Sequence, residues 1–224
     1  MKKIVTVIGA RPQFIKASPV SRAIREKGDI QEVIIHTGQH FDDNMSAVFF
    51  DQMQIPRPDY WLDIHSLPHG AMTGRMIEKI EEVLIAERPE MLMVYGDTNS
   101  TLAGALAAAK LHIPVAHVEA GLRSFNMKMP EEINRILTDR VASKLFCPTP
   151  TAKKNLLNEG FNDFGCEIHV TGDVMYDAAL MLGKKATKPA DVNLSGKFIL
   201  LTIHRQENTD EPDRLASILR AMNE

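Results

Sequence analysis

The chain has 224 residues, of which 44% are hydrophobic and 25% charged, and its formal net charge is −3. This length can bury one substantial core, or one domain and the beginning of another. The slightly acidic balance, without a basic stripe, excludes nucleic acid from the expected partners. The sequence contains no run of about 18 apolar residues, so no membrane contact is expected. Two cysteines without a C-x-x-C spacing fit a reducing compartment, which predicts a cytoplasmic protein without a disulfide framework.

Short β-branched runs predict strands, in chain order, at residues 4–8, 32–36, 91–95, 114–118, 144–147, 167–171 and 197–203. Helical patterns lie between most of them, at 14–27, 72–87 and 102–111. The third pattern is rich in alanine, which is typical of a helix packed closely on a sheet. Such alternation predicts an α/β fold, a Rossmann-like parallel sheet with right-handed crossovers and helices on both faces.

The composition changes near residues 184–196, where proline, glycine, small and charged residues follow one another without periodicity. This is linker composition. We therefore expect a Rossmann-like domain at 1–185, a linker at 186–196, and the first strand and helix of a second domain at 197–224. Because one strand and one helix cannot form a domain, we expect the chain to be a truncated form.

The first predicted strand ends in the turn I-G-A-R-P-Q-F-I-K. Gly9 permits a tight turn, and Pro12 suits the first position of a helix whose N-terminus would favour an anion. Arg11 and Lys16 add positive charge, so an anionic ligand such as a phosphate is expected. The turn matches neither G-x-G-x-x-G nor a Walker P-loop. An ordinary turn with solvated basic residues is the alternative interpretation.

Two later strands each end in a carboxylate, Asp97 and Glu119. The carboxyl ends of parallel strands meet at one edge of a sheet, where ligands bind. Glu131 and Glu132 open the next helix behind Pro130, so several carboxylates are expected in one crevice. Crowded carboxylates raise one another's pKa, which suits them to proton transfer near neutral pH.

Arg123 and Arg135 are expected close enough to these carboxylates to balance their charge. Each carboxylate also has a structural interpretation. Asp97 precedes T-N-S-T and could be a helix N-cap, and the glutamate pair behind Pro130 could serve the helix dipole. Their occurrence together at successive strand ends favours function.

Histidines fall in two clusters and several isolated positions. His36 and His40, with Asp42 nearby, are four residues apart, but the Thr37–Gly38 turn between them argues against a metal site. The last predicted strand is followed by His204 and a polar cluster, which either meets a ligand or caps the next helix. The remaining histidines considered are interpreted as loop or surface residues: His65, His69 and His112.

The ordered motifs G-A-R-P-Q-F-I-K, H-T-G-Q-H, Y-G-D-T-N-S-T, H-V-E-A-G-L-R, P-E-E-I-N-R, T-G-D-V-M-Y-D and I-H-R-Q-E-N resemble the non-hydrolysing UDP-N-acetylglucosamine 2-epimerases over essentially the whole chain. The resemblance implies the first half of a two-domain architecture like that of the B-type glycosyltransferases. It implies interconversion of UDP-N-acetylglucosamine and UDP-N-acetylmannosamine for bacterial surface polysaccharides. It also implies no metal or nicotinamide cofactor, a homodimer, and allosteric activation by the UDP-sugar.

The family chemistry eliminates UDP across carbons 1 and 2 and then adds it back, with protonation of carbon 2 from the opposite face. By resemblance, Asp97, Glu119 and Glu131 are the acid and base carboxylates. His204 corresponds to an active-site histidine near the phosphates. The expected substrate-binding residues are Arg11, Lys16, Arg123, Arg135, Arg205, Glu207 and Asn208. The region of the allosteric UDP-sugar site is expected at Gln39, His40 and Arg75.

The sequence departs from the commonest family pattern at the first turn, where Ala10, Gln13 and Phe14 replace threonine, glutamate and alanine. The segment R-S-F-N-M-K-M-P-E-E-I-N-R-I-L-T-D also resembles the branch that acts on UDP-2,3-diacetamido-2,3-dideoxyglucuronate. The loss of a negative charge at Gln13 would ease binding of such a sugar carboxylate, so this substrate is the alternative.

Two alternatives of other classes are a B-type glycosyltransferase and a non-catalytic UDP-sugar-binding remnant. Deuterium exchange at carbon 2 of the sugar, expected only of an epimerase, discriminates among them. The 224-residue chain alone is expected to be inactive, because most of the second wall of the cleft would be missing.

Overall fold

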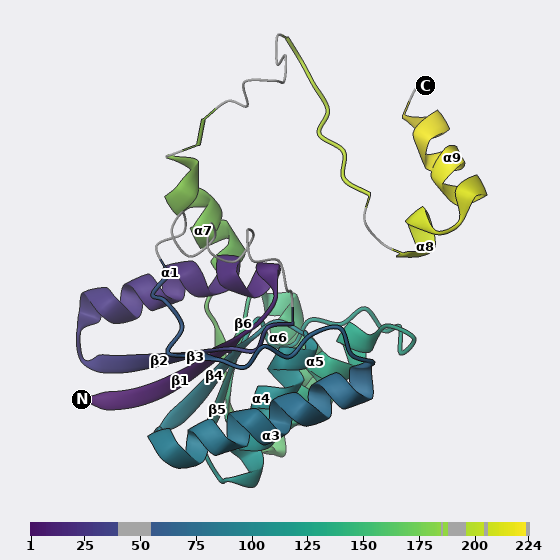
Figure 1. Cartoon of the computed structure of the whole chain (residues 1–224). Helices are drawn as coiled ribbons and strands as arrows, with labels where there is room; N and C mark the ends of the chain where they lie inside the picture. The colour runs from purple at the N-terminus through teal and green to yellow at the C-terminus, as the bar shows by residue number, and fades with distance from the viewer. Residues whose placement is uncertain (40–54, 185, 188–195, 204–205, 223–224) are drawn as a thin grey trace. The chain divides into compact units, whose positions relative to one another are not determined.

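The computed structural model describes residues 1–39, 55–184, 186–187, 196–203 and 206–222 (Figure 1). The chain divides into two compact units, Met1–Lys185 and Ala186–Glu224. Within the described residues, no helix is both long enough and apolar enough to cross a membrane. The first unit holds the sheet. It also holds every predicted site residue with a described side chain except Asn208.

Seven strands of the first unit form one entirely parallel sheet in the order β3-β2-β1-β4-β5-β6-β7. The order reverses between β1 and β4, which makes this pair the switch point of the sheet. Ligands of open α/β sheets bind outside the carboxyl ends of the strands at such a point. The strands are β1 (Lys2–Ile8), β2 (Ile30–His36), β3 (Tyr60–Trp61), β4 (Met91–Tyr95), β5 (Val115–Val118), β6 (Lys144–Cys147) and β7 (Glu167–Val170).

Helices cover both faces of the sheet (Figure 1). Helices α1 and α7 pack together on one face, and α3, α4 and α5 follow one another on the other. Alternate residues of β1 explain the two layers, because Val5 and Val7 belong to the α3–α4 core while Ile8 belongs to the α1 core. The helices of this unit are α1 (Arg11–Lys27), α3 (His69–Glu87), α4 (Asn99–Lys110), α5 (Pro130–Val141), α6 (Pro150–Asn158) and α7 (Val174–Gly183).

The alanine-rich helix α4 lies very close to the sheet, as predicted. A Cβ atom at Gly104 would stand 3.1 Å from a methyl group of Val94 and 3.2 Å from one of Val7. Ala103 and Ala107 are fully buried. Small side chains thus bring the N-terminus of α4 to the carboxyl end of β4, which is the position of the predicted site.

The predicted strands of the first unit are confirmed to within two residues at each end. The two-residue strand β3 was not predicted, because so short a segment carries no alternating pattern. The strand predicted at 197–203 is wrong, since these residues form no strand in the structure. Phe198, Ile199 and Leu200 are exposed there. A strand exists only by pairing, and none of the described residues pairs with this run.

The second unit contains the helices α8 (Gln206–Thr209) and α9 (Pro212–Ala221) in its described part. Proline at the start of α9 suits a first helical turn. No side chain of α9 is buried, so its amphipathic sequence has no covering layer among the described residues.

Candidate active site

The turn after β4 is built from Gly96, Asp97 and Thr98. Gly96 has φ 63°, and a Cβ atom there would lie 2.8 Å from Nζ of Lys16 and 3.2 Å from Oε2 of Glu119. Glycine is therefore required both by the backbone conformation and by the approach of two charged side chains. The side chains of Lys16 and Glu119 consequently meet directly above the residue that precedes Asp97.

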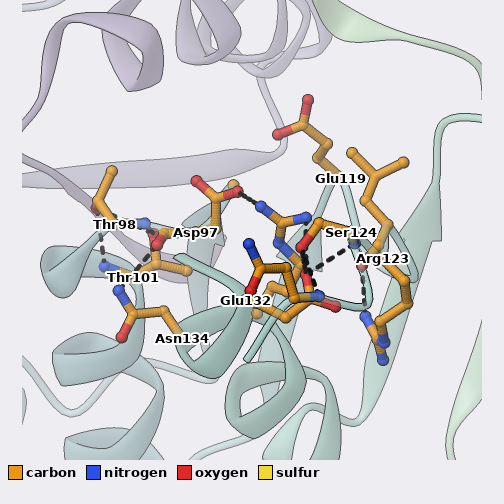
Figure 2. A network of polar contacts seen from close by, with 12 residues as sticks. Asp97, Thr98, Thr101, Glu119, Arg123, Ser124, Glu132 and Asn134 are labelled. Carbon is orange, nitrogen blue, oxygen red and sulfur yellow. Dashed lines mark hydrogen bonds and ion pairs between the residues drawn. The ribbon is translucent and has the colours of Figure 1, made fainter. Parts of the chain in front are cut away.

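Asp97 is not the cap of the helix that follows it. Thr98 is the N-cap of α4, and its hydroxyl accepts a hydrogen bond from the backbone N–H of Thr101. The capping interpretation of Asp97 is therefore wrong. The Asp97 carboxylate instead lies 2.6 Å from Nη2 of Arg135 (Figure 2). Its side chain keeps 28% of its surface exposed, so the pair sits at a solvent-accessible edge.

Glu119 follows β5, the neighbour of β4, so the two predicted carboxylates do follow the carboxyl ends of adjacent strands. Its backbone has φ 78°, an uncommon value for a residue other than glycine. The N–H groups of Glu119 and Ala120 both donate to the carbonyl oxygen of Phe146, each at 3.0 Å. These bonds fix the turn that directs the Glu119 carboxylate toward Nζ of Lys16, with which it forms an ion pair.

The two glutamates at the start of α5 have different environments. Glu131 is exposed, whereas the Glu132 carboxylate is buried and accepts hydrogen bonds from Ser124 N, Ser124 Oγ and Phe125 N, each at 2.9 Å (Figure 2). Burial raises the pKa of Glu132, but these bonds and the charge of Arg135 outweigh it and lower the pKa overall. Glu132 therefore anchors the preceding loop, and Glu131 is the member of the pair that faces outward.

A pocket of about 250 Å³ opens at the N-termini of α3, α4 and α5. It brings together Asp97 and Glu131, two of the three predicted carboxylates. Glu119 and Lys16 lie beside it, over Gly96, and do not line it. The polar groups of the pocket wall include Gln39, His69, Asp97, Asn99, Glu131 and Asn134.

Arg123 does not join this group. Its guanidinium is 1% exposed and lies 2.7 Å from Asp139 and 2.7 Å from Glu159. Figure 2 shows it on the opposite side of its loop from the Glu119 carboxylate. Burial lowers the pKa of Arg123, but its two acidic partners outweigh burial and raise it. The prediction that Arg123 balances the crevice carboxylates and binds substrate is wrong, because its buried guanidinium pairs with Asp139 and Glu159.

Asp139 is the centre of a buried network that sequence reasoning missed. Oδ1 lies 2.7 Å from Nδ1 of His117, while Oδ2 accepts from Arg123 and from the N–H of Gly121 at 3.1 Å. The other nitrogen of His117, Nε2, donates to the carbonyl oxygen of Gly96 at 2.7 Å. This network joins the turn that carries Asp97 to the loop that carries Glu119, so it holds both carboxylates in register.

Gln13 does not face the site either. Its side chain is 1% exposed. Oε1 accepts from the N–H groups of Gly9 and Ala10, while Nε2 donates to the carbonyl oxygen of Tyr95 and to the Thr101 hydroxyl. The amide thus ties the first turn to β4. The prediction that Gln13 eases the binding of a sugar carboxylate is wrong, because its side chain is buried and bonded to protein groups.

The other predicted residues are dispersed. Arg11 is exposed at the first position of α1, and Arg75 is exposed on α3. Gln39, expected at an allosteric site, instead lines the same pocket as Asp97 and accepts hydrogen bonds from N and Oγ of Ser100 at 3.1 and 2.8 Å. Asn208 lies in α8 of the second unit. Three predicted residues and one predicted side chain lie outside the described part of the chain: His40, His204 and Arg205, and the side chain of Glu207.

His36 is also removed from the proposed chemistry. Its ring is buried, stacked on Phe14 and Trp61 at centroid distances of 5.2 and 4.1 Å, and its Nδ1 accepts from the N–H of Gly38. Burial lowers the pKa of His36 to about 4. The ring is therefore neutral at physiological pH and packs inside the protein at the carboxyl end of β2.

The fold and site together define a Rossmann-type α/β protein with a pocket at the switch point of the sheet, whose wall includes Asp97 and Glu131. A model of the UDP-N-acetylglucosamine 2-epimerase family matches residues 22–224. The UDP-2,3-diacetamido-2,3-dideoxy-D-glucuronate 2-epimerase of Pseudomonas aeruginosa is 62% identical over 99% of this chain and 63% of the relative. The chain belongs to the UDP-N-acetylglucosamine 2-epimerase family, which confirms the resemblance seen in its motifs.

Solved structures agree with this assignment. The crystal structure of the Methanocaldococcus jannaschii UDP-GlcNAc 2-epimerase in complex with UDP-GlcNAc and UDP has a TM-score of 0.87 and 48% identity, covering 98% of this chain and 61% of that one. The structure of Acinetobacter baumannii MurG, at 15% identity and a TM-score of 0.50 over 68% of this chain and 42% of that one, shares the fold alone. The predicted Rossmann-like class is confirmed. The chain spans less than two thirds of the length of its epimerase relatives.

Proposed function

We propose that the protein is a non-hydrolysing UDP-sugar 2-epimerase whose proton-transfer groups are Asp97, Glu119 and Glu131. The observation that supports the proposal is that Asp97 and Glu131 line one pocket, while Glu119 follows the neighbouring strand and pairs with Lys16 over Gly96. Asp97 and Glu119 follow adjacent strands and each is held by a cation, while Glu131 faces the pocket that Asp97 lines. Positioned acids and bases of this kind are what proton transfer at a carbon centre requires.

The chemistry follows from the substrate class. The hydrogen on carbon 2 of a UDP-2-acetamido sugar is not acidic, because no carbonyl is attached to that carbon. A base removes this proton as the bond between carbon 1 and the diphosphate oxygen breaks, which gives a 2-acetamidoglucal and UDP. Addition of UDP at carbon 1 with protonation of carbon 2 from the other face gives the epimer. The elimination releases a proton and UDP, and the addition takes up UDP and a proton, so the two steps need no oxidant or reductant.

The cations suit the departing diphosphate. Lys16 and Arg135 lie within reach of the two strand-end carboxylates, and Arg11 is exposed at the N-terminus of α1. A helix N-terminus with basic side chains favours a phosphate group. We assign the diphosphate to this side of the crevice. The roles of His204, Arg205, Glu207 and Asn208 stay predictions from the resemblance.

UDP-N-acetylglucosamine is the proposed substrate, and UDP-2,3-diacetamido-2,3-dideoxyglucuronate is a second candidate. The second is favoured by one observation. The Pseudomonas aeruginosa relative named for it is 62% identical, against 48% for the Methanocaldococcus jannaschii UDP-N-acetylglucosamine 2-epimerase. Competition between the two UDP-sugars for the intact protein decides the matter, and a clear preference for either one excludes the other as the main substrate.

The test is deuterium incorporation at carbon 2 of the UDP-sugar in deuterated water, measured with the intact protein. We expect Asp97→Asn, Glu119→Gln and Glu131→Gln each to lower exchange by a factor on the order of 10²–10⁴. Glu78→Gln is the matched control, because Glu78 is exposed on α3 away from the pocket. Binding of the UDP-sugar without any exchange would replace the epimerase by a binding protein, and transfer of the sugar to an acceptor would replace it by a glycosyltransferase.

We further propose that the protein is a homodimer and is activated by its own UDP-sugar near Gln39. Support for the second point is that Gln39 lines the pocket of Asp97, so a ligand there would touch the reacting one. Sedimentation velocity tests whether the protein is a homodimer. If the UDP-sugar activates the protein, exchange should depend sigmoidally on UDP-sugar concentration, and this sigmoidal dependence should be lost in Gln39→Ala. A hyperbolic dependence in the unsubstituted protein would contradict activation.

A further inference from the structure

His69 stands at the first position of α3, on a helix where the sequence indicated only Arg75 as a site residue. Its side chain lines the pocket together with Asp97 and Glu131. The ring also contacts the side chain of Asn99, whose Nδ2 lies 3.1 Å from Nδ1 of His69. This contact leaves the other ring nitrogen, Nε2, as the hydrogen-bonding atom that a ligand can meet.

Backbone geometry fixes which nitrogen of His69 carries the proton. The carbonyl oxygen of Asp97 can only accept, so the atom of Asn134 at 2.9 Å from it must be the Nδ2 donor. The same Nδ2 lies 3.3 Å from Asn99, so that atom of Asn99 must be the Oδ1 acceptor. The amide nitrogen of Asn99 therefore faces His69, and Nδ1 of the ring must accept. A neutral ring that accepts at Nδ1 carries its proton on Nε2.

The two asparagines cannot easily take another arrangement. Both are nearly fully buried, so leaving one of their polar atoms without a partner is costly. Reversing the Asn99 amide would bring its NH₂ group against that of Asn134 and leave two donors facing each other. The second hydrogen on Nδ2 of Asn99 is also used, since it is directed to Sδ of Met72 at 3.6 Å.

We propose that His69 is a substrate-binding residue that presents Nε2–H as a hydrogen-bond donor to an oxygen acceptor on the sugar. The chain Asp97–Asn134–Asn99–His69 sets its tautomer, so the residue that carries one proton-transfer carboxylate also orients the donor. The inference rests on the proposed function for the identity of the ligand. The sugar, and not the uridine, is assigned here because the pocket of about 250 Å³ contains Asp97 and Glu131. The acceptor class is an amide carbonyl or carboxylate oxygen.

The tautomer is tested directly by long-range ¹H–¹⁵N correlation spectroscopy of the histidine rings in the full chain without ligand, with His69 assigned by comparison with His69→Gln. We expect an unprotonated Nδ1 and a protonated Nε2 at neutral pH. Asn99→Asp replaces the donor by an acceptor of the same shape, so its His69 is expected to carry a proton on Nδ1. A proton on Nδ1 in the unsubstituted protein would overturn the proposal.

Ligand contact is tested by calorimetric binding of UDP-N-acetylglucosamine, UDP-2,3-diacetamido-2,3-dideoxyglucuronate and UDP. His69→Phe keeps the ring and removes both nitrogens, whereas His69→Gln can return an N–H donor. We expect Kd for a UDP-sugar to rise about threefold to tenfold in His69→Phe, the worth of one hydrogen bond, and to be largely restored in His69→Gln. The UDP affinity should not change.

The two sugars separate the two acceptors. Weakening of both UDP-sugars points to the amide carbonyl they share, and weakening of the glucuronate alone points to its carboxylate. Equal affinity of His69→Phe and the unsubstituted protein for both sugars would overturn the ligand contact while leaving the proposed function intact. Failure of the unsubstituted protein to bind any of the three ligands would overturn the proposed function and the contact together, with the tautomer still measured.

Discussion

Removal of the Asp139 carboxylate should destabilise the fold in proportion to the donors it leaves unpaired. The carboxylate is completely buried and accepts from His117, from Arg123 and from the backbone N–H of Gly121. Asp139→Ala strands all of these donors in the interior. Breaking a buried ion pair by removing one partner costs about 3–5 kcal/mol. At this chain length, each kcal/mol lowers Tm by about 2–4 °C, so a fall of roughly 6–20 °C is expected.

Asp139→Asn separates hydrogen bonding from charge. The amide oxygen can still accept from Arg123 and Gly121, while its NH₂ group can donate to Nδ1 of His117 in the neutral ring. Bonds to charged groups contribute about 1.5–3 kcal/mol and neutral ones about 0.5–1.5 kcal/mol. The loss on this substitution is therefore expected to be about 1–3 kcal/mol, clearly below that of Asp139→Ala.

Urea unfolding followed by far-UV circular dichroism measures both variants, with Asp29→Asn as the control. Asp29 forms an exposed pair with Lys27, and such pairs contribute about 0–1 kcal/mol. A changed midpoint at constant slope would report stability alone. An Asp139→Ala protein within 1 kcal/mol of the unsubstituted one would refute the network. Equal losses in Asp139→Ala and Asp139→Asn would show that charge, and not the pattern of acceptors, holds the two loops.

Three smaller perturbations test neighbouring features. Gly96→Ala forces alanine into a left-handed conformation and pushes on Lys16. We expect the free energy of unfolding to fall by about 1–2 kcal/mol and deuterium exchange at carbon 2 to fall as well. Unchanged exchange would show that this turn is not part of the site. Thr98→Ala removes the cap of α4 and should cost about 1 kcal/mol, with Thr98→Ser near the original stability in urea unfolding. Burial lowers the pKa of His36 to about 4 from 6.5, so the unfolded chain binds a proton first. Stability is then full above about pH 6.5 and falls toward pH 4 by up to about 3 kcal/mol. His36→Gln should lack this component in a pH series of urea unfolding, and parallel profiles for the two proteins would contradict the assignment.

The sheet was predictable because its central strands contain short apolar runs, and the helices between them repeat with their own period. The same logic placed Asp97 and Glu119 beside each other, since both follow strand ends and the ends of neighbouring strands coincide. It failed for 197–203, which has the composition of a strand. An apolar run becomes a strand only when a neighbouring strand pairs with it, and none of the described residues pairs with 197–203.

Side-chain partners were harder to predict than positions. Arg123 and Arg135 were equally near the predicted carboxylates in sequence, yet Arg135 pairs with Asp97 and Arg123 with Asp139 and Glu159. The difference arises from α5 and α6, which place acidic groups on the opposite side of the loop that carries Arg123. Local sequence around an arginine contains nothing about such a partner, so only the packed structure distinguishes the two.

His69 illustrates how much of a site is determined at this second level. By composition it was a loop histidine, and its spacing to other polar residues indicated no role. Its orientation is set by Asn99 and Asn134, which are 30 and 65 positions away in the chain, and through them by one backbone carbonyl, that of Asp97. The Asp97 carbonyl oxygen sets which end of the Asn134 amide faces it, and Asn134 in turn sets the orientation of the Asn99 amide. In this way a backbone group at a strand end selects the tautomer of His69 through two side chains. A sequence search for the site can therefore find the carboxylates, which follow strands directly, but it cannot find the donor that depends on them.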